Sequence, residues 1–197
     1  RTDVVSLTHG IGGAHPNLPV PRRHTAELRS PALANPRPPV VEPLEPPELF
    51  EWFVALRESF GMNVVPLGHG AGAAVANAIR AAEVVCLVCD RDLNGNGVEV
   101  EFFGERTTLP AAPATLALRT GAPLLPPAVY YRGKGHHATI REAIPTDRRG
   151  SLREDVTRVT QVLARELEAL IRAEPAQWHI LQPNWPSDRA ALAALRA

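Results

Sequence analysis

The sequence predicts an α/β fold in which a sheet is flanked by helices. An apolar run at residues 84–89, bounded by charge, is typical of a strand buried on both faces. A second apolar run at 124–131 predicts another strand. Amphipathic helical patterns precede, separate and follow these two runs, the longest of them starting at Ser151. Strands that alternate with helices in this way indicate the α/β class.

Composition limits the domain organisation and the partners. A chain of 197 residues suits one domain with a sizeable core. Lys+Arg and Asp+Glu are equal at 21 each, so we expect no nucleic-acid partner. No apolar run reaches the roughly 18 residues that a membrane-spanning helix needs. Many of the 20 prolines lie in residues 1–45, so we expect this segment to be poorly ordered or non-native and residues 46–197 to form the domain.

The first part of that domain predicts a helix and then a βαβ unit. The helix starts at the Pro46-Pro47 pair and ends at Gly61. Strands at 63–67 and 84–89, with a helix at 72–82 between them, predict a parallel, right-handed unit. The apolar residues of the first helix follow at the spacing of a helix that packs on a core: Leu49, Phe50, Trp52, Phe53, Leu56 and Phe60.

The second part predicts a helix, a hairpin and a long helix. A helix at 111–120 should end at Gly121. A turn at 132–135 predicts a hairpin whose return strand, 136–144, carries on one face Ala138, Ile140 and Ile144. Ser151 and Glu154 form a capping box. The helix that they start has an inward stripe of Leu152, Val156, Val159, Leu163, Leu167 and Leu170.

The two cysteines and the closing segment have structural interpretations. Cys86 and Cys89 form a C-x-x-C, but on a strand they point to opposite faces, so we expect two buried thiols rather than a disulfide or zinc pair. In the closing segment, we expect three residues to brace the fold through hydrogen bonds and packing: His179, Gln182 and Trp185.

One alternative function is a dinucleotide-binding βαβ oxidoreductase module. Gly68-x-Gly70-x-x-Ala73 follows a strand and opens a helix, and Asp90 ends the next strand about 20 residues later. A pyrophosphate would then lie at the helix N-terminus and Asp90 would bind the ribose. Glycines at a tight strand-to-helix turn also need no ligand.

A second alternative is a calcium-binding loop from Asp90 to Glu101. Asp90-x-Asp92-x-Asn94-Gly95 followed by Glu101 matches the EF-hand spacing. An EF-hand needs a helix on each side, whereas the flanking segments VVCLVC and VEVEF have strand patterns.

The third interpretation is a family resemblance over about residues 40–188. The segments that carry it are VVEPLEPPELFEWFVALRESFGMNVVPL, VVCLVCDRDLNGNGVEVEFFGERTTLPAAPATLALRTGAPLLP and WHILQPNW, in that order. The chain resembles the bacterial phosphatidylinositol mannoside acyltransferases, within the wider lipid A lauroyl/myristoyl acyltransferase family. Three segments in order are more specific than a short glycine pattern, so we prefer this interpretation.

The resemblance implies a fold, a reaction and a location. The fold would be that of the glycerolipid acyltransferases, with a mixed sheet flanked by helices. The reaction would move a fatty acyl group from acyl-CoA, a substrate and not a cofactor, to a sugar hydroxyl of a membrane glycolipid. The implied partners are acyl-CoA, the glycolipid acceptor and the cytoplasmic membrane surface, to which the protein would bind peripherally. No cofactor or metal is implied.

The resemblance also implies substrate-binding residues. Glu42 and Arg57 match positions near the reacting hydroxyl and the polar head, and Asp90, Arg91 and Asp92 match a charged loop lining the same groove. Arg57 has the alternative of solvating a helix end. Asp90 and Asp92 have the alternative of pairing with Arg91 and nearby basic residues.

The catalytic H-x-x-x-x-D motif of the family is absent from this sequence. None of the seven His has an Asp five positions later, and the nearest candidate, His9, has Ala14 there. We hypothesise that the chain is N-terminally truncated or frame-damaged, and we expect it to be inactive or nearly so. Without a positioned base, proton transfer alone loses a factor of roughly 10²–10⁴.

Overall fold

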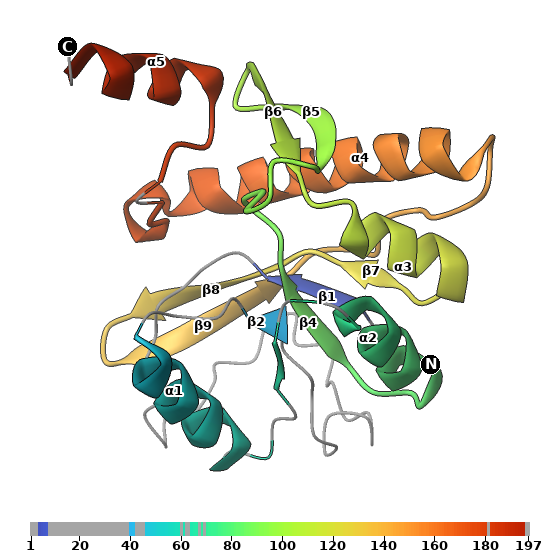
Figure 1. Cartoon of the computed structure of the whole chain (residues 1–197). Coiled ribbons are helices and arrows are strands. Elements are labelled where there is room, and N and C mark those ends of the chain that lie inside the picture. The colour runs from blue at the N-terminus through green and yellow to red at the C-terminus, as the bar shows by residue number, and fades with distance from the viewer. Residues whose placement is uncertain are drawn as a thin grey trace.

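The computed structural model describes residues 4–7, 40–41, 46–59, 61, 64–66, 68, 70–180 and 182–195 (Figure 1). They form an α/β arrangement of short sheets and helices. The strands are β1 (Val4–Leu7), β2 (Val40–Val41), β3 (Val65–Pro66), β4 (Val85–Val88), β5 (Val98–Phe102), β6 (Glu105–Leu109), β7 (Leu124–Leu125), β8 (Pro127–Arg132) and β9 (Gly135–Ile140). The helices are α1 (Pro47–Ser59), α2 (Ala71–Arg80), α3 (Ala112–Thr120), α4 (Leu152–Ala173), the 3₁₀ helix η2 (Pro175–Gln177) and α5 (Pro186–Leu195).

The central sheet is parallel and contains three strands in the order β4-β1-β7. Its register pairs Val4 with both Val85 and Leu124. Two antiparallel hairpins, β5-β6 and β8-β9, and the parallel pair β2-β3 complete the pairing among the described strands. The α/β class predicted from the sequence is therefore present.

The predicted βαβ unit is wrong in its pairing, although its elements exist. β3 pairs with β2, and β4 pairs with β1, so the two strands that flank α2 lie in different ladders. The apolar pattern of β4 shows that the strand needs neighbours, but it does not say which strand supplies them. Here β1, from far earlier in the chain, occupies the place beside β4.

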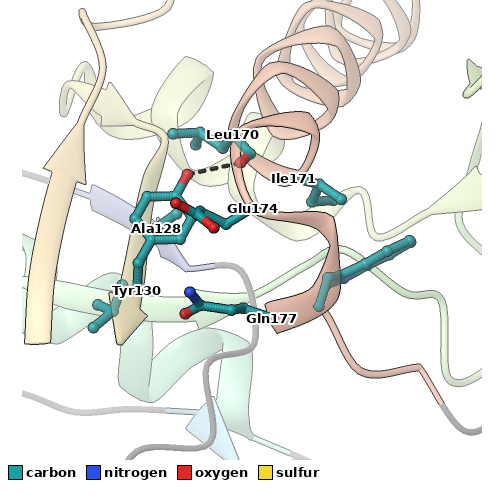
Figure 2. A pocket seen from close by; sticks show the side chains of 8 residues that line it. Ala128, Tyr130, Leu170, Ile171, Glu174 and Gln177 are labelled. Atoms are coloured by element: carbon teal, nitrogen blue, oxygen red, sulfur yellow. Dashed lines mark hydrogen bonds between the residues drawn. The ribbon is translucent and has the colours of Figure 1, made fainter. Parts of the chain in front are cut away.

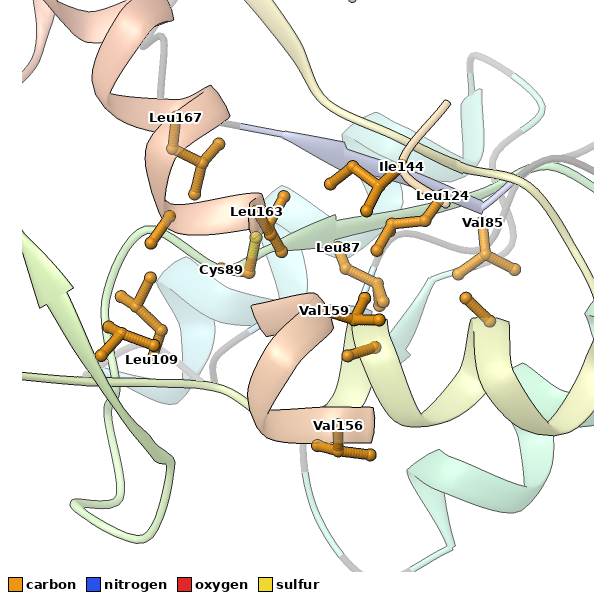
Figure 3. Packing of buried hydrophobic residues seen from close by; sticks show 14 of the residues in the cluster. Val85, Leu87, Cys89, Leu109, Leu124, Ile144, Val156, Val159, Leu163 and Leu167 are labelled. Atoms are coloured by element: carbon orange, nitrogen blue, oxygen red, sulfur yellow. The ribbon is translucent and has the colours of Figure 1, made fainter. Parts of the chain in front are cut away.

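The hydrophobic core lies between the central sheet and helices α3 and α4 (Figure 3). Five of the six residues in the predicted stripe of α4 are buried, namely Val156, Val159, Leu163, Leu167 and Leu170, and the sixth, Leu152, is partly buried against the core. From the hairpin and the central sheet come Phe102, Leu109, Val85 and Leu124, each fully buried. Burial of apolar side chains at this density is the main source of stability here.

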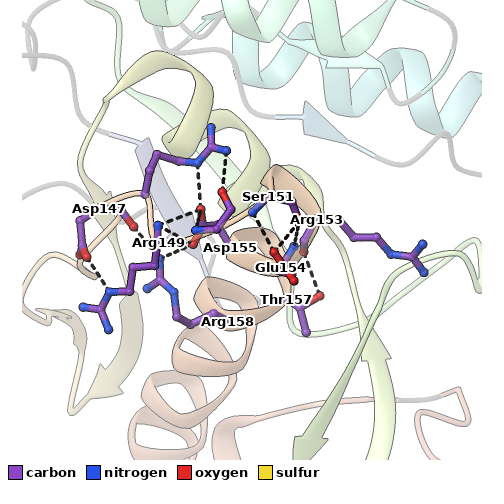
Figure 4. Close-up of polar contacts among 10 residues, drawn as sticks. Asp147, Arg149, Ser151, Arg153, Glu154, Asp155, Thr157 and Arg158 are labelled. Carbon is purple, nitrogen blue, oxygen red and sulfur yellow. Dashed lines mark hydrogen bonds and ion pairs between the residues drawn. The ribbon is translucent and has the colours of Figure 1, made fainter.

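Helix α4 starts as the sequence predicts. The Ser151 hydroxyl accepts from the Glu154 amide, and the Glu154 carboxylate accepts from the Ser151 amide at 2.8 Å. One residue further, the buried carboxylate of Asp155 accepts from Arg148 at 2.8 Å and Arg158 at 3.0 Å (Figure 4). Burial alone would raise the pKa of Asp155, but these guanidinium groups and the Arg149 and Gly150 amides hold it far below its ordinary value.

Two predicted burial patterns are wrong. β4 is buried on one face and not on both, because Val88 is 47% exposed. On β9, Ala138 and Ile140 are exposed, while Ile144, beyond the strand, is buried by its bridge to Leu124. A short two-stranded hairpin covers only one side of each strand, so an apolar run there does not guarantee burial.

Helix α1 forms where predicted and is followed by Gly61 with φ 77°, but it has no buried residue. Leu49, Trp52 and Leu56 are exposed, Trp52 by 58%. In the view of Figure 1, α1 lies apart from α4 and the β5-β6 hairpin. Helical spacing identified the element, but it did not identify a partner for its apolar face. Phe60 lies outside the described residues.

The predicted boundary at residues 45 and 46 stays a prediction. Two described strands, β1 and β2, lie on its N-terminal side.

Candidate functional site

The charged loop predicted from the sequence follows β4 directly. The apolar strand ends at Val88, and Asp90, Arg91 and Asp92 come next. The carboxyl end of a parallel strand is where α/β sheets commonly place polar chemistry. β1 ends level with β4, since Leu7 pairs with Val88. The loop therefore lies at the carboxyl edge of the central sheet.

Asp90 is buried, and it is bonded to the closing segment of the chain. Its side chain is 2% exposed, and Oδ2 accepts from the indole Nε1 of Trp178 at 2.7 Å. Its main-chain oxygen accepts from the side-chain Nδ2 of Asn184 at 3.4 Å. Asn184 is itself buried, and its main-chain oxygen accepts from the Thr107 hydroxyl. These contacts fix the loop to residues almost a hundred positions later.

Arg91 points toward the same segment from the next position in the loop. Its Nη1 donates to the Gln182 Oε1 at 2.8 Å, and its side chain is half-buried. The bracing predicted for Gln182 is therefore confirmed. So is that for Trp185, whose Nε1 donates to the Phe102 main-chain oxygen at 2.9 Å and whose ring stacks on Phe102. His179 is exposed, so the prediction that it braces the fold is wrong.

Asp92 organises its own loop. Its carboxylate accepts from the amides of Gly97 at 2.7 Å, Gly95 at 3.1 Å and Asn94 at 3.2 Å. Partial burial alone would raise the pKa of Asp92, but a hydrogen bond from Thr108 and these three amides lower it below its ordinary value. Gly97 is required at its position, because a Cβ there would collide with the Leu109 main-chain oxygen.

The other predicted site residues are not joined to this loop among the described residues. Arg57 lies on α1, where its Nη1 donates to the Phe53 main-chain oxygen at 3.3 Å and its guanidinium lies over the Phe53 ring. This geometry matches its alternative role at a helix end. Glu42 and His9 lie outside the described residues.

The alternative binding motifs gain no support from the geometry. Gly70 begins α2 with φ 90°, as a tight turn requires, and His69 lies outside the described residues. The Asp90–Glu101 segment runs from the end of strand β4 into strand β5 and is not flanked by helices. In the described parts of the chain, no group of three His, Cys, Asp or Glu could hold a metal. Cys86 and Cys89 are not joined by a disulfide; Cys89 is buried as predicted, whereas Cys86 is only partly buried.

Next to Trp178 lies a small cavity between β8 and the end of α4 (Figure 2). Its ≈10 Å³ is about the space of one water molecule. The Tyr130 hydroxyl in its wall donates to the Leu170 main-chain oxygen at 2.7 Å, and burial, with help from Glu174, raises the pKa of that hydroxyl. Neither Asp90 nor Arg91 lines this cavity.

Sequence reasoning missed the role of Trp178. Phe102, Phe103, Trp178 and Trp185 form one aromatic cluster with ring centroids 4.8–6.2 Å apart. A buried indole N–H needs an acceptor, and the Asp90 carboxylate supplies it. The available signal was a tryptophan-rich closing segment together with a strand-end carboxylate.

No helix in the described ranges is long and apolar enough to span a bilayer.

Comparison with known proteins places the chain in a family. Residues 32–187 match the family model of the bacterial lipid A biosynthesis acyltransferases. The chain is 41% identical over 152 residues to a phosphatidylinositol mannoside acyltransferase of Mycobacterium tuberculosis, which covers 76% of this chain and 46% of that protein. It is 40% identical over 152 residues to the protein of that name from Mycolicibacterium smegmatis, again over 76% of this chain and 48% of the relative. The chain therefore spans about half the length of these curated relatives. It belongs to the bacterial lipid A biosynthesis acyltransferase family.

Proposed function

We propose that this protein is part of an acyltransferase that moves a fatty acyl group from acyl-CoA to a sugar hydroxyl of a phosphatidylinositol mannoside type glycolipid. The observation that carries the proposal is the family match over residues 32–187, together with relatives named phosphatidylinositol mannoside acyltransferase. A fold like that of the glycerolipid acyltransferases, with residues 46–197 as the C-terminal part of the acyltransferase domain, is part of the same proposal. A parallel sheet with a charged loop at its carboxyl edge supports it.

The proposed reaction transfers one acyl group from sulfur to oxygen. The hydroxyl oxygen attacks the thioester carbonyl, an ester C–O bond forms, the C–S bond breaks, and the departing thiolate takes the proton. The negative charge on the attacked oxygen is stabilised by positive groups and backbone N–H groups. Our proposed substrate-binding residues are Glu42, Arg57, Asp90, Arg91 and Asp92. Of the loop residues, half-exposed Arg91 is the one whose charge can best contact a polar head.

Asp90 and Asp92 serve the proposal by holding that loop in place. Both use their carboxylate oxygens on the protein itself, Asp90 on Trp178 and Asp92 on Gly95 and Gly97. Carboxylates already bonded in this way add little to direct substrate binding, but they fix the position of the loop from which Arg91 would contact the substrate.

We further propose that turnover by this chain is low. The sequence has no H-x-x-x-x-D motif, the nearest candidate being His9 with Ala14 five positions later, and acyl transfer without that general base is slower by roughly 10²–10⁴. We place the protein at the cytoplasmic face of the membrane as a peripheral protein, and we propose no nucleic-acid partner because acidic and basic residues balance.

Ligand-dependent thermal unfolding of the full chain tests the binding part of the proposal. A long-chain acyl-CoA at about 100 times its Kd should stabilise the protein by about 2.7 kcal/mol, whereas NAD and NADP should leave Tm unchanged. Arg91→Gln should reduce the acyl-CoA effect, and Arg165→Gln on the exposed face of α4 is the matched control. Protection by NAD with none by acyl-CoA would refute the proposal.

An acyl-transfer assay with a mannosylated phosphatidylinositol acceptor tests the proposed low turnover. We expect a rate about 10²–10⁴ below that of a full-length relative under the same conditions. Turnover equal to that of the relative would show that the chain does not lack its base.

A further inference from the structure

A second, larger hollow of ≈720 Å³ lies away from the aromatic cluster, between the start of α4, helix α3 and the start of β5. This volume is within the range of small-molecule sites. Apolar side chains form much of its wall: Val98, Ala111, Leu152 and Val156. At one edge lies Gly97, whose amide donates to Asp92, but the candidate residues Asp90, Arg91 and Asp92 do not line it.

Two arginines line this hollow with unpaired guanidinium groups. Arg119 is in the last turn of α3, Arg153 is in the first turn of α4, and both side chains are exposed. Within the described part of the chain, neither guanidinium has a hydrogen bond or an ion pair. Figure 4 shows Arg153 extending away from the Asp155 cluster. Arg148 and Arg158, by contrast, are paired with Asp155.

The acidic residue in the lining does not neutralise these two arginines. Glu99 is paired with Arg106 of the neighbouring strand, with Oε1 and Nη1 2.9 Å apart. The hollow therefore combines an apolar wall with two free positive charges. A half-buried threonine, Thr115, adds a hydroxyl to the lining.

We propose that this hollow binds an amphiphile that has a phosphate-like anionic head and a short apolar tail. Guanidinium groups match phosphate oxygens through paired N–H donors, and two of them in the lining of one hollow favour a doubly charged head. The apolar wall gains by removing a hydrocarbon tail from water. The site lies outside the residues of the proposed acyl-transfer site, so it does not rest on that function.

Calorimetric titration of the full chain with three probes tests the proposal. Octyl phosphate carries both head and tail, inorganic phosphate carries only the head, and octyl glucoside carries only a tail with a neutral head. We expect octyl phosphate to bind about tenfold or more tightly than either of the others. Equal binding of inorganic phosphate would reduce the site to a simple anion site and overturn the proposal. Binding of octyl glucoside as tight as that of octyl phosphate would show that the arginines do not recognise an anionic head, and would also overturn the proposal.

Substitutions then locate the site. Arg119→Gln with Arg153→Gln should raise the Kd for octyl phosphate about tenfold or more without changing the Tm of the free protein, because both side chains are exposed. Arg165→Gln, twelve positions beyond Arg153 on the same helix and roughly 18 Å along its axis, should change nothing.

Two further variants keep the test independent of folding and of the acyl-transfer site. Arg153→Lys retains the charge but loses the planar fork, and should raise the Kd by a smaller factor. Arg91→Gln should weaken protection by acyl-CoA and leave octyl phosphate binding unchanged. Unchanged binding in the double arginine variant, or a loss equal to it in Arg91→Gln, would refute the assignment of the hollow.

Discussion

The hydrogen bond from Trp178 to Asp90 should contribute measurably to stability. Asp90 is 2% exposed, and the donor and acceptor atoms, Nε1 and Oδ2, are 2.7 Å apart. Trp178→Phe removes the N–H but keeps an aromatic ring against Phe103, on which Trp178 stacks at 5.7 Å. Hydrogen bonds to charged groups contribute about 1.5–3 kcal/mol, so we expect Trp178→Phe to lower the free energy of unfolding by about 1.5–3 kcal/mol or more.

A double-mutant cycle separates this bond from the loss of ring surface. Asp90→Ala, Trp178→Phe and the double variant would be unfolded in urea and followed by far-UV circular dichroism. We expect a coupling energy of about 1.5–3 kcal/mol, because the two side chains are in direct contact. The control pairs Asp90→Ala with Trp52→Phe, an exposed ring on α1, and should be additive.

Two outcomes would contradict this reasoning. A coupling energy below about 0.5 kcal/mol is within the scatter of independent sites, and would mean that the bond does not hold the loop to the closing segment. A control cycle with equal coupling would mean that the substitutions change the unfolded state instead.

Other predictions test the core, the loop and the start of α4. Leu163→Ala removes a fully buried side chain and should cost about 2–5 kcal/mol of unfolding free energy in urea, whereas Leu195→Ala at an 83% exposed position should cost about 0.5 kcal/mol or less; equal losses would contradict the assigned core. Gly97→Ala should lower the free energy of unfolding by about 1–3 kcal/mol or more, because a Cβ at this position has no room. Gly72→Ala, in open space on α2, should raise it by about 0.5–1 kcal/mol. Thermal unfolding compares the two variants, and an unchanged stability of Gly97→Ala would refute the close approach of Gly97 to Leu109. The pKa of Asp155 is lowered in the folded state, so its contribution is present above the unfolded pKa of about 3.9 and is lost as pH falls below it. Between about pH 6 and about pH 3 the Tm of the wild type should therefore fall more than that of Asp155→Asn, and parallel curves would contradict the assignment.

Much of the local structure was predictable because local chemistry determines it. Ser151 and Glu154 specify where α4 begins, and the periodic leucines and valines that follow specify its buried face. Gly121, with φ 72°, ends α3 where the sequence indicates. These features depend on residues within one or two helical turns of each other, so a single sequence contains enough information.

The pairing of strands and the partners of exposed faces were not predictable in this way. The pattern of β4 does not reveal that β1 is its neighbour, and the apolar spacing of α1 does not reveal that Trp52 is exposed. Both depend on segments distant in sequence, which periodicity does not report.

The candidate site shows the same division. The charged loop after β4 was identified from its sequence, but its contacts with Trp178, Gln182 and Asn184 were not. A side chain that packs across ninety positions leaves no local spacing to recognise. The resemblance to a family supplied the loop residues. Only the structure shows that Asp90 is buried against Trp178, that Asp92 bonds within its own loop, and that half-buried Arg91 donates to Gln182.

The middle position of β1 in the central sheet has a consequence for how the chain assembles. Its two neighbours, β4 and β7, both come much later in the sequence, so β1 has neither sheet partner until residues 85–88 have been made. Pairings of this kind raise contact order and slow folding. Until then, an unpaired Val4–Leu7 edge is available to other chains, and coexpression with a chaperone should raise the yield of native protein.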